Sequence, residues 1–244
     1  MIKKSCIMFV LSCLCLSQET RITLGMNYSS CTTEGIDDAF EREFQTNDLN
    51  VNFNTNSDYM DGLSFGIENI DSKGSITGLT WTRRGFDLES NASVNLGSLY
   101  YEYNNNISAQ IDLTIKQKAD YITGYFLFPL SRSNRIQFYG GMEVGYLLEV
   151  KMTGVSSVTL GYNGQNEISS YPMTLKADTD DWEDMGGNIF DYGLLLAAEY
   201  EMNSKVSLKL SYYHGLVEDI EPDVEYAHRG IKLSISMASS NLTY

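Results

Sequence analysis

Residues 136–148 read IQFYGGMEVGYLL and alternate between apolar and polar or small side chains. One set of alternate positions is apolar: Ile136, Phe138, Met142, Val144, Tyr146 and Leu148. The other set holds Gln137, Tyr139, Gly141, Glu143 and Gly145. Successive side chains of a β-strand point to opposite faces, so this period of two predicts a strand with one apolar and one polar face.

Seven further segments carry the same period or a strand-like composition. They are centred on residues 22–28, 63–68, 75–83, 122–128, 192–200, 206–213 and 231–237. Each is close to the ~9–11 residues that a tilted membrane strand needs. The sequence therefore predicts an all-β protein with eight strands.

The connections between these segments alternate in length. Residues 29–59, 85–119 and 149–188 are long connections, residues 217–225 are intermediate, and short turns fall at 71–74, 131–134 and 202–205. Outer-membrane barrels have tight periplasmic turns and extended extracellular loops. This parity predicts a closed, antiparallel, up-and-down transmembrane β-barrel of eight strands in the bacterial outer membrane, with long acidic extracellular loops.

Charged residues recur on the polar face of the predicted strands. In a membrane barrel this face points into the narrow lumen, where charges must be paired or hydrated. The expected lumen charges are Glu68, Glu143, Asp191, Glu199, Lys209 and Lys232. The alternative is a soluble barrel with the faces exchanged, apolar inside and charged outside.

The first residues have the layout of an export signal. Lys3 and Lys4 precede a short apolar stretch, residues 6–16, and small or polar residues follow. We expect a signal peptide at residues 1–17 and the barrel domain at 18–244. A cytosolic start and a lipid-attachment signal at Cys13 are alternatives. Beyond the signal only Cys31 remains, which leaves no pair of cysteines for an internal disulfide or a zinc site.

Acidic residues outnumber basic ones by 32 to 17, giving a formal charge of −15. Binding nucleic acid requires clustered Lys and Arg, so nucleic acid is excluded as a partner. The expected partners are outer-membrane lipid, the barrel-assembly machinery, which reads terminal aromatics such as Tyr244, and an envelope protein that the sequence does not identify.

Three stretches resemble the PorT-like family of outer-membrane β-barrel proteins, which are common in Bacteroidetes. They are LTWTRRGF at residues 79–86, DYITGYFLFPL at 120–130, and YGG with VGYLL within 139–148. FDYG at 190–193 and YYHGLVEDI at 212–220 are similar to two later family segments. The resemblance implies the fold and the location, and implies little about activity.

Few residues suit catalysis or cation binding. His214 and His228 flank the last connection and could form a His–Asp site at the rim, but polar rim histidines are the favoured interpretation. The carboxylates Asp178, Asp180, Asp181, Glu183 and Asp184 could bind Ca²⁺ weakly, but a solvated loop is the favoured interpretation. The same holds for the acids between residues 34 and 43. No other cofactor is expected.

The sequence thus favours a non-enzymatic barrel with a role in envelope structure, adhesion or a secretion complex. A porin-like barrel that passes small solutes is the alternative, and a rim hydrolase is a third. Eight strands leave little lumen, which favours the first of these.

Overall fold

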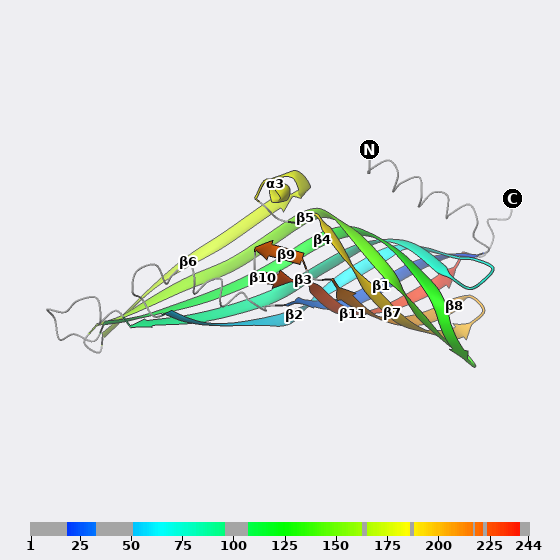
Figure 1. Ribbon diagram of the computed structural model, residues 1–244, viewed down its shortest axis with the longest axis horizontal. Coiled ribbons are helices and arrows are strands. Elements are labelled where there is room, and N and C mark those ends of the chain that lie inside the picture. Colours follow the sequence, from blue (N-terminus) through cyan, green and yellow to red (C-terminus); the bar gives the residue numbers. More distant parts are fainter. Residues whose placement is uncertain are drawn as a thin grey trace.

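The computed structural model describes residues 19–32, 51–95, 107–162, 165–185, 188–216, 218–221 and 224–239 (Figure 1). Within these residues almost every segment is a β-strand, and the single helix, α3 (Thr179–Asp184), is six residues long. The described part of the chain has no helix long and apolar enough to cross a membrane. The signal peptide predicted at residues 1–17 lies outside the described residues.

Eight antiparallel strands close into a ring, as predicted. In ring order they are β1 (Glu19–Cys31), β2 (Val51–Ile70), β3 (Ile76–Asn95), β4 (Ile107–Ser133), β5 (Ile136–Tyr162), β7 (Phe190–Asn203), β8 (Val206–Gly215) and β11 (His228–Ala238). The first and last strands complete the ring, with Met26 opposite Leu233. Closure pairs the backbone groups of every ring strand on both sides, which a sheet in lipid requires.

Tight turns join the strands at one end of the ring, which we call the turn end. In the β2–β3 turn, the Asp71 carboxylate accepts hydrogen bonds from the amides of Lys73 and Ser75, both at 2.8 Å. Gly74 has a φ of 82° there, a conformation that glycine adopts without strain. The β2–β3 turn therefore lies at the predicted position, whereas the turn predicted at 131–134 falls at residues 134–135, because β4 continues to Ser133.

The two faces of the ring differ in chemistry. Outward side chains on the ring are apolar and exposed, for example Met26 at 63% and Phe65 at 56%. Inward side chains are mostly polar and buried, for example Thr123 and Ser236 at 0%. An apolar exterior around a polar interior fits lipid outside the ring, so the soluble barrel with exchanged faces is excluded.

The connections predicted as long loops are largely strands, which corrects the sequence analysis. β2, β3, β4 and β5 continue well past the ring, and β6 (Gln165–Asp178) pairs with the far part of β5. Figure 1 shows these five strands as an elongated sheet, with α3 beside the end of β6. We call this the projecting sheet. β9 (Glu218–Glu221) and β10 (Val224–Tyr226) form a separate two-stranded sheet in the last connection.

The chemistry of the two faces reverses where the strands leave the ring. On β3, the inward positions change from Thr82 and Arg84 to the buried Phe86 and Leu88, while the outward positions become acidic at Asp87 and Glu89. Water replaces lipid outside, so the outward face becomes polar. The inward face gains small apolar clusters, such as Cys31, Phe86 and Leu88 with Ile115. Because the outward positions of these strands are polar beyond the ring, their sequence resembles that of polar loops.

Candidate functional site

The lumen of the ring holds two groups of ionised side chains. The first lies toward the turn end and is centred on Glu68, which is 1% exposed. Its carboxylate accepts hydrogen bonds from Lys209 Nζ and the Tyr125 hydroxyl, and from Ser236 Oγ at 3.1 Å. Nearby, Arg21 binds Glu199 across the ring. These side chains come from six strands, so they link opposite walls of the barrel.

The second group lies toward the projecting sheet and is centred on Arg84 of β3. Its guanidinium binds both Glu143 of β5 and Asp191 of β7. Tyr213 covers it, with the guanidinium carbon 4.0 Å from the ring centroid, and also donates a hydrogen bond to Asp191. The second carboxylate oxygen of Asp191 lies 3.1 Å from His228 Nδ1. Asp191 therefore contacts three side chains, those of Arg84, Tyr213 and His228.

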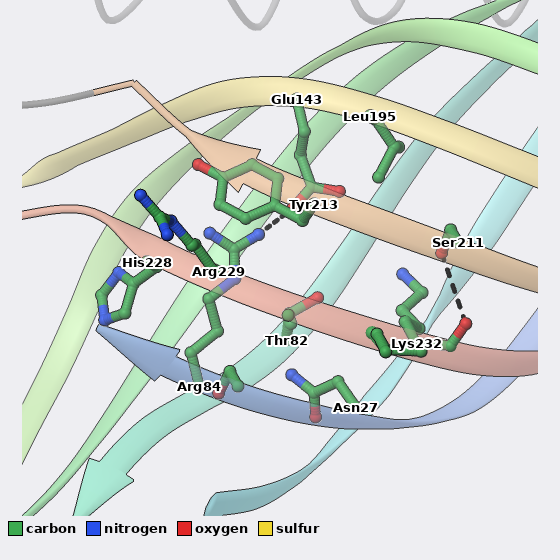
Figure 2. Close-up of a pocket in the computed structure, with 13 residues that line it drawn as sticks. Asn27, Thr82, Arg84, Glu143, Leu195, Ser211, Tyr213, His228, Arg229 and Lys232 are labelled. Carbon is green, nitrogen blue, oxygen red and sulfur yellow. Dashed lines mark hydrogen bonds and ion pairs between the residues drawn. The ribbon is translucent and has the colours of Figure 1, made fainter. Parts of the chain in front are cut away.

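A small cavity of about 30 Å³ lies beside Arg84, room for a few water molecules (Figure 2). Arg84, Glu143, His228 and Lys232 all line it. Lys232 also lies 5.5 Å from the ring centroid of Tyr125, so it stands between the two charged groups. Toward the turn end the lumen is filled by an apolar cluster that includes Ile76, Leu127 and Leu195.

Charges of both signs lie together in the lumen of the described residues. The cations are Arg21, Arg84, Lys209 and Lys232, and the anions are Glu68, Glu143, Asp191 and Glu199. Each of these four anions lies near one of the cations, as a narrow space of low dielectric requires, and Arg21 also binds the partly exposed Glu19 at the turn end. One oxygen of Glu199 has no hydrogen-bond partner among the described residues.

The structure places the six predicted lumen charges on the inward face and adds two arginines. Lys209 contacts Glu68 directly, whereas Glu143, Asp191 and Glu199 meet the arginines. Sequence reasoning missed Arg84 because the facing of residues 75–83 was ambiguous. Thr80, Thr82 and Arg84 occupy alternate positions of one strand, and this period of two was the signal that could have predicted an inward Arg84.

The two histidines lie on opposite faces of the barrel wall. His228 is 2% exposed and points into the lumen, against the edge of the Tyr121 ring. His214 is on the outward face, with its Nδ1 3.3 Å from the Tyr212 hydroxyl. The interpretation of both as polar rim histidines is therefore wrong for His228, because its strand starts earlier than the sequence indicated.

The acidic run at residues 178–184 forms the helix α3 and its cap. The Asp178 carboxylate accepts hydrogen bonds from the amides of Asp180 and Asp181, both at 3.0 Å. The described residues contain no group of three or more His, Cys, Asp or Glu side chains arranged to hold a metal ion. Weak Ca²⁺ binding by Asp178, Asp180, Asp181, Glu183 and Asp184 stays a prediction, and the acids between 34 and 43 lie outside the described residues.

Comparison with known proteins gives only distant similarities. No protein-family model and no curated protein matches the chain. Among solved structures it is similar to Neisserial surface protein A, with 7% identity and a TM-score of 0.32, over 89% of this chain and 96% of that chain. It is similar to Ail of Yersinia pestis at 14% identity and a TM-score of 0.31, over 90% and 97% of the two chains. OprG from Pseudomonas aeruginosa has 10% identity and a TM-score of 0.32, over 91% and 94%.

These likenesses are too weak to carry information about activity. The closed ring, its apolar exterior and its charged, filled lumen decide the class of protein. The chain is an outer-membrane β-barrel. Its assignment to the PorT-like family stays a prediction.

Proposed function

We propose that this barrel is a non-enzymatic membrane anchor that presents the projecting sheet outside the cell. One observation carries the proposal: β5 pairs with β7 as far as Tyr146 and then continues for sixteen residues, to Tyr162. At ~3.3 Å per residue this is about 50 Å of extended chain that the membrane does not need. The turns at the other end are periplasmic in barrels of this type, so the projecting sheet is extracellular.

The role that best fits such a sheet is adhesion, envelope structure or a place in a secretion complex. The projecting sheet exposes polar side chains on β3, such as Glu89 and Asn91, and apolar ones on β5 and β6, such as Val155 and Ile168, which offer a surface to partners.

The lumen argues against the porin-like alternative. The ion pairs of Arg84 and of Lys209 cross it, and the apolar cluster around Leu127 fills the space between them and the turn end. A path for solutes would need these pairs to separate inside the barrel. The opposite facing of His214 and His228 supports a non-enzymatic role, because they do not share a rim site.

Surface labelling tests the orientation. A cysteine at the exposed Asn91 of β3 should react with a membrane-impermeant maleimide on intact cells, whereas a cysteine at the exposed Ser72 of the β2–β3 turn should react only after the cells are opened. The native Cys31 is buried and serves as the background. Labelling of Ser72→Cys on intact cells, in place of Asn91→Cys, would contradict the orientation.

Shortening the projecting sheet tests the function. Asp87 and Lys116 are cross-strand partners, as are Val155 and Pro172, so an Asn-Gly turn between each pair removes residues 88–115 and 156–171. The shortened protein should remain a heat-modifiable barrel and should lose protein-dependent cell adhesion. Adhesion equal to that of the full chain, or large stable conductance of the full chain in planar bilayers, would contradict the proposal.

A further inference from the structure

Three lysines stand directly opposite one another on adjacent strands of the projecting sheet. Lys118 of β4 pairs with Lys151 of β5, and Lys151 pairs with Lys176 of β6. Figure 1 shows these three strands side by side. All three lysines are exposed, and they are outward because their neighbours Ala119, Val150 and Ala177 are buried on the inward face. We call them the lysine row.

A row of like charges in register is unfavourable by itself. Side chains directly opposite on antiparallel strands have Cβ atoms only about 4.5–5.5 Å apart, and like charges at such positions destabilise a sheet. Lys176 is partly compensated by Glu149, with Nζ 2.8 Å from the carboxylate. In the described residues neither Lys118 nor Lys151 has an ion-pair partner. Among the described residues, no side chain therefore neutralises the repulsion between Lys118 and Lys151.

The acids next to the row are already engaged. Asp120, Glu149 and Asp178 form the adjacent row on the same face, one step closer to the ring. Asp120 accepts two hydrogen bonds from Arg83, at 2.7 and 2.8 Å, Glu149 binds Lys176, and Asp178 caps α3. No acid among the described residues remains to pair with Lys118 or Lys151, so a ligand from outside the chain would find two ammonium groups to bind.

The position of the row indicates what that ligand is. On β4, the outward side chains after Asp120 belong to the lipid-facing surface. They include Ile122, which is 37% exposed, and Phe126, which is 50% exposed. Lys118 is the outward residue next to Asp120 on the side away from the ring, so the row lies at the level of the lipid headgroups. Elsewhere on the rim the outward residues are aromatic, such as Tyr28 stacked on Tyr59 with centroids 5.1 Å apart.

We propose that the lysine row binds phosphate groups of lipid headgroups in the leaflet that surrounds the base of the projecting sheet. Ammonium groups make charge-assisted hydrogen bonds to phosphate, and a cation near an anionic membrane surface strengthens binding roughly five-fold. Phosphorylated lipid thus gathers on one side of the barrel, along β4–β6. The assignment rests on the proposed extracellular position of the projecting sheet and is independent of its role in adhesion.

Titration of the folded full chain in neutral detergent with diphosphoryl lipid A, followed by native mass spectrometry, tests the assignment. The double variant Lys118→Gln/Lys151→Gln should bind on the order of 25-fold more weakly than the native chain. The matched control Lys73→Gln/Lys205→Gln removes two exposed lysines at the turn end and should bind normally. Lys118→Arg/Lys151→Arg keeps both charges and should also bind normally.

Three outcomes would overturn the proposal. The first is a Gln variant that binds lipid A no more weakly than the turn-end control does. The second is equal binding of dephosphorylated lipid A. The third is displacement of the lipid by inorganic phosphate when sodium chloride at the same ionic strength leaves it bound, which would make the row a free-phosphate site. If the Gln variant does not fold, lipid A binding by the native chain is measured at increasing salt concentration. Binding that does not weaken as the salt concentration rises excludes the lysine row.

Discussion

Arg84 and Asp191 form a buried ion pair across the lumen although 107 residues separate them in the chain. The same guanidinium binds Glu143, so one cation neutralises two carboxylates from different strands. Burying a charge in a narrow lumen is costly unless it is paired. Arg84 thereby ties β3 to β5 and β7 and makes closure of the ring and pairing of the lumen charges depend on each other.

Replacing Arg84 by Ala should strongly destabilise the barrel. Glu143 and Asp191 would remain buried without their shared cation, at a cost of about 3–5 kcal/mol. Denaturant unfolding of the refolded protein in detergent measures this change. The matched control is Arg132→Ala, because Arg132 binds Glu201 at the exposed turn end, and its loss should cost about 1 kcal/mol or less. Equal effects of the two changes would refute the role given to Arg84.

Gly141 should not tolerate a side chain. A Cβ there would collide with the backbone carbonyl of Phe126 on the paired strand β4. Gly141→Ala should therefore reduce the fraction of protein that folds into a heat-modifiable barrel, because overpacking costs roughly 1–3 kcal/mol. Gly124 of β4 is the control, since a Cβ there meets no atom within 4 Å. Normal folding of Gly141→Ala would mean that β4 and β5 lie further apart.

Pro172 protects the outer edge of β6. In the described chain β6 pairs only with β5, so its other edge is open, and proline interrupts the row of backbone donors. Pro172→Thr should increase self-association of the folded barrel in detergent, measured by analytical ultracentrifugation. The exposed Thr174→Val on the same strand is a control that adds apolar surface while keeping the proline. Monomeric Pro172→Thr would show that the edge needs no such block.

Asp71 should stabilise the β2–β3 turn only above acidic pH. Burial acts to raise the pKa of Asp71, but hydrogen bonds from the amides of Ser75 and Lys73 outweigh it and lower the pKa below the ordinary value. The carboxylate's contribution is thus complete above its unfolded pKa, near pH 4, and is lost as pH falls through the lower folded pKa. The difference in stability between the native chain and Asp71→Ala should be constant near neutral pH and shrink in acid. A difference that grows in acid would contradict this sign.

Calcium binding by the acidic run is decided by calorimetry on the folded protein. Asp180→Asn/Asp181→Asn should abolish weak, millimolar heats of Ca²⁺ binding and leave the cap by Asp178 in place. The control variant is Glu89→Gln/Asp87→Asn on β3, which removes two acids from another part of the projecting sheet. Absence of a heat of binding in the native chain leaves these carboxylates as a helix and its cap.

The sequence determined the ring because the information for it is local. In residues 136–148 a strand with one lipid-facing and one lumen-facing side is the only regular structure that sorts the side chains by chemistry, and Glu143 follows from the same alternation. The short turns, such as the one held by Asp71, are local as well. Eight such segments in a membrane must close, since an open edge would leave backbone groups unpaired in lipid.

Only the tertiary structure decided how far the strands extend and which charges meet. The strands beyond the ring face water on one side and each other on the other, so their pattern reverses, and pairing such as that of Lys118 with Lys151 comes from register over long separations. Arg84 follows the regular alternation of β3, but only the pairing of β3 with β2 and β4 decides which set of alternate residues faces the lumen. His228 became a lumen residue because β11 begins at that residue, opposite Cys31 of β1. Contacts between distant strands fix these properties, and no single segment contains them.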